Sequence, residues 1–242
     1  MDQLDPPNAS IIQVSSSFSS TSVGLLSHLV MIEERLPFTV RLVLNQEDLK
    51  KAVHIRQSAY ARHLPELAEK LKLPETLDAE PGVVVLLAES KVDGVPLGTM
   101  RIQTNQYAPL LLEQSLDLPE WLKFRTLAEA TRLGISLNGT GRLVKTALFK
   151  SYYQYCKDND IEWMVIAGRS PIDRQYERLM FEDVYPDLGY IPLRHADNMP
   201  HRVMALEVAA VEPKWRIAHH ALYQFFFHTT HPDINTVVDL TD

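Results

Sequence analysis

Apolar and polar residues in the first half of the chain follow two different periods, which predict strands and one long helix. Alternation from Phe38 to Leu44 predicts a strand. A helically spaced apolar stripe predicts a helix over residues 46–62, and Asn45 is a suitable cap for its first turn. Apolar runs at 83–89 and 97–104, separated by a turn signal, predict a β-hairpin.

The second half is organised around residues 124–155, where a strand candidate runs through a glycine turn into a long helix. Apolar patterns predict further elements: strands at 161–167, around 189–191 and at 202–208, a helix at 173–181, and an aromatic-rich terminal helix at 212–228. The order strand, helix, hairpin, strand, long helix, strand, helix, strand predicts an α/β (α+β) fold. Its mixed sheet would have one central crossover helix.

Composition restricts the class of protein. Residues 1–21 are rich in Ser, Asp and Pro, so we expect a loose N-terminal arm there and a single domain over 22–242. The net charge of −7 argues against nucleic acid as a partner. The single cysteine, Cys156, excludes an internal disulfide and favours a cytoplasmic protein. No apolar run reaches the ~20 residues of a membrane helix, so we expect no integral membrane segment.

The turn Gly139-Thr-Gly141-Arg142 is a candidate phosphate site. Two glycines at the start of a helix let the backbone approach a phosphate, which the helix dipole also attracts. Arg142 and Lys145 lie in the first turn, where a bound phosphate would offset the unfavourable position of a cation. The alternative is an ordinary strand-to-helix turn, because neither a P-loop nor a dinucleotide fingerprint is complete.

Glu129 and Arg132 lie within an otherwise apolar strand candidate. A buried carboxylate is costly unless it is paired, and burial raises its pKa toward the range of a general base for an amine. Arg132 would point to the opposite face of a regular strand, but a bulge would bring both residues to one side. A general base and a structural ion pair are equally compatible with this pattern.

Three arginines, Arg56, Arg101 and Arg132, each occur inside an apolar element. Buried guanidinium groups need anionic partners, so we predict that the three share one polar site. Asp78 and Glu80 are possible partners, although solvated loop acids are the simpler interpretation of both.

Histidines are frequent near the end of the chain, and His201 and His231 could bind a metal ion. No HExxH spacing occurs and a cysteine cluster is absent, so we predict no metal site. The aromatic residues of this region instead indicate a packed terminal helix.

These motifs, in this order, resemble the GNAT-type acyltransferases. Within them the sequence is similar to the group of acyl-homoserine-lactone autoinducer synthases and bacterial long-chain N-acyl amino acid synthases. The resemblance covers roughly residues 38–208, and the ending 219–234 is more similar to the amino acid synthases. The matching residues are Arg56-x-x-x-Tyr60, Gly98-Thr99-Met-Arg101, Glu129-x-x-Arg132 and the glycine turn that follows.

The resemblance implies a GNAT-like fold in which two neighbouring central strands splay apart and receive the pantetheine arm of an acyl thioester. It also implies that Arg56, Arg101, Glu129 and Arg132 shape the donor and acceptor sites. The sequence departs from the group in two places. The paired acids that usually follow the first helix are not evident, with Asp78 a partial match. The phosphate loop is incomplete, which leaves both CoA and an acyl carrier protein as donors.

We therefore expect an N-acyltransferase that moves a long-chain acyl group from an acyl carrier protein or CoA to the α-amine of an amino acid or similar small amine. The thioester is a co-substrate, and no other cofactor is expected. Alternatives are an autoinducer synthase that uses S-adenosylmethionine and a non-catalytic acyl-thioester-binding module. The expected roles are as follows: Glu129, general base; Arg132 and Arg101, acceptor carboxylate; Arg56, Tyr60 and Thr99, substrate binding; Leu148 and Tyr152, acyl tunnel; Gly139, Gly141, Arg142 and Lys145, donor phosphate.

Overall fold

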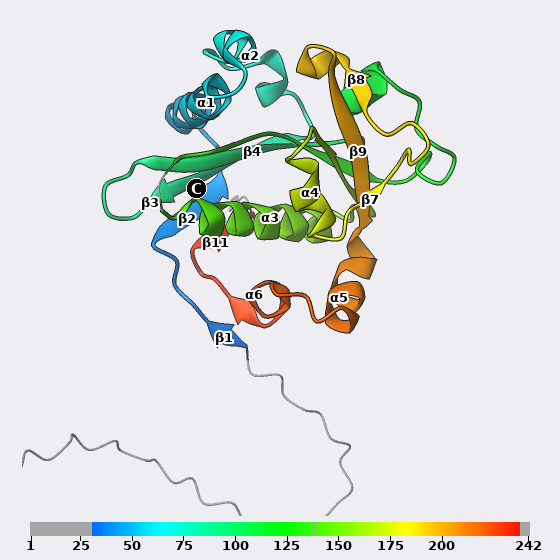
Figure 1. Ribbon diagram of the computed structural model, residues 1–242. Helices are drawn as coiled ribbons and strands as arrows, with labels where there is room; N and C mark the ends of the chain where they lie inside the picture. The colour runs from blue at the N-terminus through cyan, green and yellow to red at the C-terminus, as the bar shows by residue number, and fades with distance from the viewer. Residues whose placement is uncertain (1–30, 138, 238–242) are drawn as a thin grey trace, which may run out of the picture. The chain divides into compact units, whose positions relative to one another are not determined.

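The computed structural model describes residues 31–137 and 139–237, which form one nine-stranded sheet with helices on both faces and a separate two-stranded ribbon (Figure 1). The strands are β1 (Ile32–Glu33), β2 (Phe38–Leu42), β3 (Val83–Ser90), β4 (Pro96–Thr104), β5 (Leu127–Ile135), β6 (Trp163–Gly168), β7 (Glu182–Asp183), β8 (Ile191–Leu193), β9 (Met199–Glu207), β10 (Thr229–Thr230) and β11 (Ile234–Asn235). The helices are α1 (Gln46–Ala61), α2 (Pro65–Lys70), α3 (Gly141–Asp158), α4 (Asp173–Glu177), α5 (Val208–Ile217) and α6 (Tyr223–Phe227), with one-turn 3₁₀ helices η1 (Thr76–Ala79), η2 (Leu111–Gln114) and η3 (Arg194–Ala196).

The sheet is mixed, as the sequence predicts. Its order is β11-β2-β3-β4-β5-β6-β9-β7, and β8 pairs with β9. From β2 to β5 the neighbours are antiparallel, whereas β5 and β6 are parallel and are joined by the crossover helix α3. The central crossover therefore falls where the strand–turn–helix pattern predicts it.

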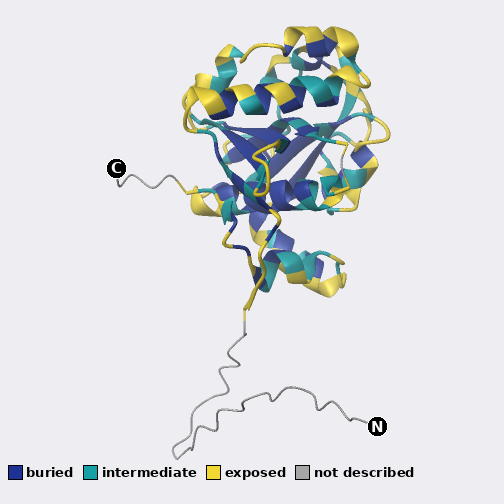
Figure 2. Ribbon diagram, turned by 90° about the vertical axis from the view of Figure 1, so that its left-hand side faces the viewer, coloured by how far each residue is buried: buried dark blue, intermediate teal, exposed yellow. Residues whose placement is uncertain are grey.

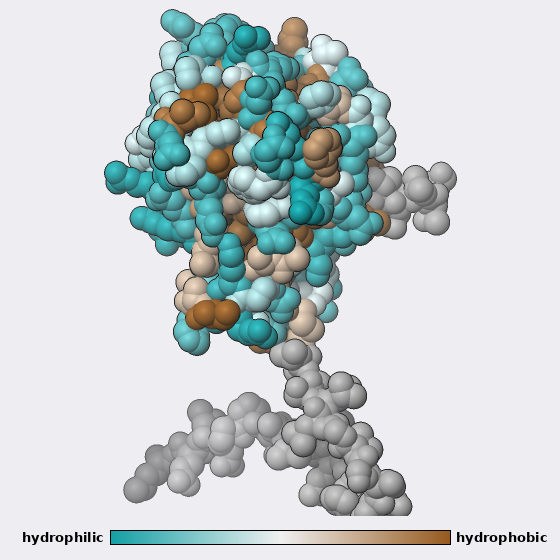
Figure 3. All heavy atoms as spheres, turned by 90° about the vertical axis from the view of Figure 1, so that its right-hand side faces the viewer, coloured by the Kyte–Doolittle hydropathy of each residue, from teal (hydrophilic) through white to brown (hydrophobic). Residues whose placement is uncertain are grey.

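The two faces of the sheet carry different helices. In Figure 1, α1 and α2 lie on one side of the sheet, and α3 to α6 lie on the other. Figure 2 shows the strands as the buried layer between helices whose outer surfaces are exposed. The face toward α3 holds the larger apolar core, which includes Ile102, Leu148 and Trp215. On the end of the molecule shown in Figure 3, hydrophilic side chains predominate and apolar ones occur in small separate groups.

Helix α1 begins as its sequence predicts. The Asn45 side chain accepts a hydrogen bond from the Asp48 amide at 2.9 Å, a cap that stabilises a helix by about 1 kcal/mol. Ala52, Ile55 and Ala59 are buried along its inner face. This face packs on β3, β4 and β5, so the end of α1 lies beside the central strands.

Three sequence-based boundaries need correction. The expected terminal helix at 212–228 is two helices, α5 and α6, with the chain turning between them at His219, whose φ is 49°. Helix α4 ends at Glu177 rather than at residue 181, and β9 starts at Met199 rather than at 202. The expected arm, residues 1–21, lies outside the described residues. Within the described ranges, no helix has the length and apolar composition to cross a membrane.

Candidate functional site

A cavity opens where β5 and β6 separate. The two strands pair from Leu127 and Trp163 as far as Ala130 and Ile166. Beyond that point, residues 131–133 and Ile135 of β5 and residues 167–168 of β6 line a cavity of about 310 Å³. The expected gap between neighbouring central strands is therefore confirmed.

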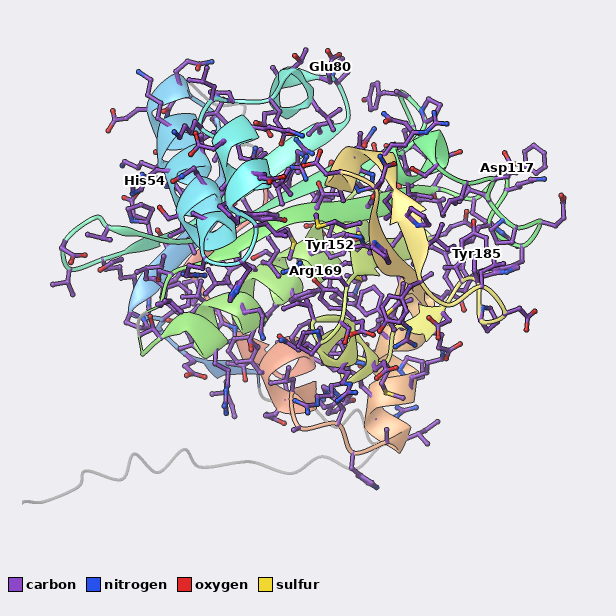
Figure 4. The ribbon with its side chains drawn as sticks, turned by 45° about the horizontal axis from the view of Figure 1, so that its top comes forward. His54, Glu80, Asp117, Tyr152, Arg169 and Tyr185 are labelled. Atoms are coloured by element: carbon purple, nitrogen blue, oxygen red, sulfur yellow. The ribbon has the colours of Figure 1, made fainter. Side chains whose placement is uncertain are left out.

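Elements from both faces of the sheet complete the wall of this cavity. Its lining includes Tyr60 at the end of α1, Lys145 in the first turns of α3, Tyr176 of α4 and His195 of η3. Arg169, which follows β6 and is labelled in Figure 4, lines it as well. Cationic, aromatic and apolar side chains thus meet in one hollow.

A β-bulge directs Arg132 toward this site. On β4, Thr99 pairs with Gly134 and Arg101 pairs with Thr131, so β5 has one more residue than β4 in this interval. Arg132 adopts a left-handed backbone with φ of 54°, a conformation that costs a non-glycine residue about 1–2 kcal/mol. Its side chain makes a bidentate pair with Glu75, with both N–O distances at 2.7 Å. A bulge was expected between Glu129 and Arg132; the structure has one at Arg132 itself, between Thr131 and Gly134.

The three arginines share one ionic cluster, as predicted. Arg56 and Arg101 are fully buried and both donate to Glu75 and Asp78 at 2.9–3.2 Å. Arg132 binds Glu75, so this carboxylate contacts all three guanidinium groups. Charge-assisted hydrogen bonds of this kind offset the cost of burying the arginines.

The acids of this cluster correct the sequence interpretation. The Asp78 side chain is fully buried rather than solvated, whereas Glu80 is exposed at the surface (Figure 4). The second acid is Glu75, which no sequence pattern singles out. Glu75 caps η1 and Asp78 lies three residues later; because a 3₁₀ helix has three residues per turn, the two side chains fall on the same side. The paired acids implied by the resemblance are therefore present, and their three-residue spacing was the available signal.

The cluster carries one positive charge in excess, because it joins three arginines and two acids. Burial alone would raise the pKa of Glu75, but the hydrogen bonds and charge of Arg132, together with the neighbouring arginines, lower it to about 2. Glu75 is therefore ionised at neutral pH. Arg132 is the arginine of the cluster that lines the cavity, so the excess charge faces that space.

Glu129 is fully buried on β5, and the next residue, Ala130, lines the cavity. Its Oε2 atom accepts a hydrogen bond from the Leu112 amide at 3.2 Å, and its Oε1 atom has no hydrogen-bond partner among the described residues. Burial raises the pKa of this carboxyl to about 7. The alternative of a Glu129–Arg132 ion pair is not found, since Arg132 binds Glu75.

His195 lies between Glu129 and the cavity. Its Nε2 atom is 3.8 Å from Oε1 of Glu129, and the residue lines the cavity. Burial, with the positive charge of Arg132, lowers its pKa to about 4, so the imidazole is neutral at pH 7. The sequence shows His195 only as one of several late histidines, and no local motif distinguishes it.

The glycine turn leads into α3 beside the cavity. Gly141 packs closely on the end of β5, because a Cβ there would lie 3.1 Å from Ile135 and 3.2 Å from the Ser136 carbonyl oxygen. Burial and the charges of Arg142 and Arg178 lower the pKa of Lys145, which lines the cavity. Several cations therefore lie on this side of the cavity. Gly139 is in open space, since a Cβ built there would have no neighbour within 4 Å.

Of the five expected substrate-binding residues only Tyr60 lines the cavity; Arg56 is fully buried in the ionic cluster, and the other three lie elsewhere. The Thr99 hydroxyl donates to the Leu86 carbonyl at 2.8 Å within the sheet, and Leu148 packs in the core beneath Gly98. Tyr152 lies below the sheet (Figure 4), where its hydroxyl bonds the backbone of Val165 on β6 and the Ala128 carbonyl on β5. None of the three lines the cavity. Tyr152 instead holds β5 and β6 together just before they separate.

Metal-ligand clusters of three or more His, Cys, Asp or Glu side chains do not occur within residues 31–137 and 139–237. No protein-family model matches the sequence, and a comparison with curated proteins likewise finds no match.

Comparison with solved structures identifies the fold. The structure is similar to that of FeeM, an N-acyl amino acid synthase from uncultured soil microbes, with a TM-score of 0.60 and 19% identity over 78% of this chain and 97% of that chain. It is also similar to BjaI, a CoA-dependent acyl-homoserine lactone synthase solved with SAM and isopentyl-CoA. That TM-score is 0.53, with 12% identity over 80% of this chain and 93% of the other. The chain has the GNAT fold that the resemblance implies.

Proposed function

We propose that this protein is an acyltransferase that moves an acyl group from a thioester to an amine. The observation that carries the proposal is the cavity between the separated ends of β5 and β6, with the buried carboxyl of Glu129 directly behind its wall. Amine acylation needs a slot for the thioester and a group that removes a proton from the ammonium. Both requirements meet at this point of the sheet.

The donor would lie along the α3 side of the cavity. Lys145 and its neighbours Arg142 and Arg178 provide positive charge there, close to the amino end of α3. A phosphate is attracted by such cations and by the helix dipole. Both CoA and the phosphopantetheine arm of an acyl carrier protein carry this phosphate, so we propose a donor of either kind.

The acceptor would bind beside Arg132. The ionic cluster has one uncompensated positive charge, and a planar guanidinium suits a carboxylate. An amino acid places its α-amine close to its carboxylate, so it could present the amine to the thioester while Arg132 holds the acid. We therefore propose an amino acid as acceptor and a fatty acyl thioester as donor, in agreement with the activity named for FeeM.

An assay that follows two products tests this function. The protein is incubated with acyl-CoA or acyl carrier protein thioesters of several lengths and a panel of amino acids. Free thiol is measured with a colorimetric thiol reagent, and the N-acyl product is measured by mass spectrometry. We expect both products to appear together and to require an α-amine. Thioester binding without thiol release for any amine would indicate a non-catalytic acyl-binding module.

The same assay with S-adenosylmethionine separates the second enzyme candidate. The similarity to the structure of BjaI is the reason to test S-adenosylmethionine as an acceptor. An autoinducer synthase would release methylthioadenosine together with the thiol, whereas an amino acid N-acyltransferase would not respond to this acceptor. Methylthioadenosine at rates above those with amino acids would contradict the proposed acceptor class.

A further inference from the structure

The carboxyl of Glu129 is enclosed, although the proposed reaction needs a base that reaches the amine. Its side chain is fully buried and is not part of the cavity wall. Among the described residues its Oε1 atom has no hydrogen-bond partner, and Nε2 of His195 lies 3.8 Å from it. An acceptor in the cavity would therefore meet the imidazole of His195 before it met Glu129.

The backbone around His195 is held in place by the elements that build the site. Arg132 donates to the His195 carbonyl at 3.2 Å, and the Arg194 amide donates to the Ser115 hydroxyl at 2.8 Å. Arg132 is itself fixed by its bidentate pair with Glu75. The backbone that carries the imidazole is thus held by the same arginine that would bind the acceptor carboxylate.

We propose that Nε2 of His195 takes the proton from the acceptor ammonium and that Glu129 acts through His195 by stabilising the imidazolium that forms. This inference rests on the proposed acyltransferase function and names the atom that serves as its base. At 3.8 Å, Oε1 of Glu129 is beyond hydrogen-bond distance of Nε2, so Nε2 stays available to the ammonium and Glu129 acts on the imidazolium through its charge.

The charges around the imidazole explain how a bound acceptor would raise the pKa of His195. Besides burial, positive charge from Arg132 and Arg101 and the neighbouring His201 lower the pKa of His195, while the Leu111 carbonyl opposes them. A substrate carboxylate on Arg132 would cancel part of this positive charge. It would therefore raise the basicity of His195 when the ammonium arrives.

Glu129 has its own surroundings, which set how it supports the imidazolium. Burial raises its pKa, the Leu112 amide and the two arginines lower it, and Glu113 raises it further. At pH 8 its carboxylate form predominates, since its pKa is about 7. A negative charge beside Nε2 favours the protonated imidazole.

The proton balance of the reaction is complete with these groups. The ammonium gives one proton to His195, and the free amine attacks the thioester carbonyl to form the C–N bond. When the tetrahedral intermediate collapses, the C–S bond breaks and the nitrogen loses a second proton. The thiolate takes one of the two protons, from His195, and the other passes to solvent.

Chemical rescue tests the assignment. His195→Ala should lower kcat/KM for thiol release by roughly 10²–10⁴-fold, the usual contribution of general acid–base catalysis. Added imidazole should restore the rate by tenfold or more, with the restored rate following the neutral imidazole fraction. Calorimetric binding of acyl-CoA should stay within about twofold of wild type. Glu129→Gln should lower kcat and shift the pH profile without a response to imidazole.

Two further variants keep the test decisive. His195→Gln fills the same space but cannot take up a proton, so we expect it to be inactive. This variant carries the test if His195→Ala is poorly folded. His54→Ala, at an exposed position of α1 (Figure 4), should behave as wild type. Full activity of His195→Gln, or loss of activity in His195→Ala that imidazole does not restore despite normal acyl-CoA binding, would overturn the inference. Absence of thiol release from the wild-type protein with every amine would instead overturn the proposed function itself.

Discussion

At the scale of single residues, the ionic cluster depends most on Glu75. This carboxylate contacts Arg56, Arg101 and Arg132, whereas Asp78 contacts the first two. Buried guanidinium groups are costly unless each is paired, and removal of one partner leaves uncompensated charge. The left-handed backbone of Arg132 persists because its bidentate pair with Glu75 offsets the strain. Glu75 therefore supports both the fold and the placement of Arg132 in the cavity.

The variant Glu75→Gln keeps the shape of this side chain and removes its charge. We expect a loss of roughly 3 kcal/mol in the free energy of unfolding at pH 7, as for a broken buried ion pair. The folded pKa of Glu75 is about 2, below its unfolded value, so its stabilisation is present above the unfolded pKa and is lost as pH falls through about 2. Urea unfolding of both proteins between pH 3 and 7 measures this, and the difference should shrink toward low pH. Glu80→Gln is the exposed control, and equal stability of the two variants would contradict this role.

At the scale of elements, periodicity was sufficient where the apolar pattern itself decides the structure. The hairpin β3–β4, the capped helix α1 and the strand–turn–helix unit β5–α3 all follow from residues local to them. The bulge in β5 could also be anticipated, because only a bulge brings Arg132 to the same side of the strand as Glu129.

The missed elements depend on contacts between distant parts of the chain. Strands β1, β10 and β11 have two residues each and exist through pairing with other segments, so no period marks them. Glu75 was missed because a one-turn 3₁₀ helix gives no amphipathic pattern, and His195 because η3 reaches Glu129 only in the folded sheet. Leu148 and Tyr152 were expected to line the acyl tunnel, but both lie outside the cavity. The cavity begins where β5 and β6 stop pairing, and the sequence does not mark that point.

The C-terminal segment is attached to α3 by a buried lysine. The Lys150 ammonium donates to the carbonyl oxygens of Phe225 and Thr229, at 2.9 and 2.6 Å, and lies 2.8 Å from Nδ1 of His231. Its residue is only 2% exposed. An ammonium has three hydrogens, so these three acceptors satisfy it completely. This one side chain therefore fixes α6 and β10 against the crossover helix.

The variant Lys150→Met should separate the two effects of this lysine. It leaves buried carbonyl groups without a donor, so we expect the protein to lose about 1–3 kcal/mol of stability at pH 7. Burial lowers the pKa of Lys150 to about 8, whereas the unfolded chain keeps its proton to higher pH. The unfolded state then binds more protons above pH 8, so the stability of wild type relative to Lys150→Met should rise from pH 8 toward 10. Denaturant unfolding at pH 7, 8.5 and 10 measures the difference, with Lys50→Met at an exposed position as control. A difference that falls with pH would refute this linkage.

At the scale of the whole molecule, charge is distributed unevenly in a way that favours an anionic donor. The chain has a net charge of −7, yet the cavity is lined by Arg132, Lys145 and Arg169, and Arg142 and Arg178 act on Lys145. A cleft of one sign concentrates oppositely charged ligands and speeds their association. An acidic protein with cations gathered at one hollow would repel anions over most of its surface and accept them at that place.

The salt dependence of donor use follows from this distribution. Between about 20 and 300 mM salt the Debye length falls from well above 10 Å to below it, so attraction between exposed charges is largely screened. We expect the KM for acyl-CoA to rise several-fold over this range, while the KM for the acyl thioester of N-acetylcysteamine, which has no phosphate, stays nearly constant. The double variant Arg142→Ala/Lys145→Ala should raise the KM for acyl-CoA at low salt and flatten its salt dependence, with kcat little changed. Equal salt dependence for the charged and uncharged thioesters would show that these cations do not bind the donor phosphates, and the positive side of the cavity would then need another ligand.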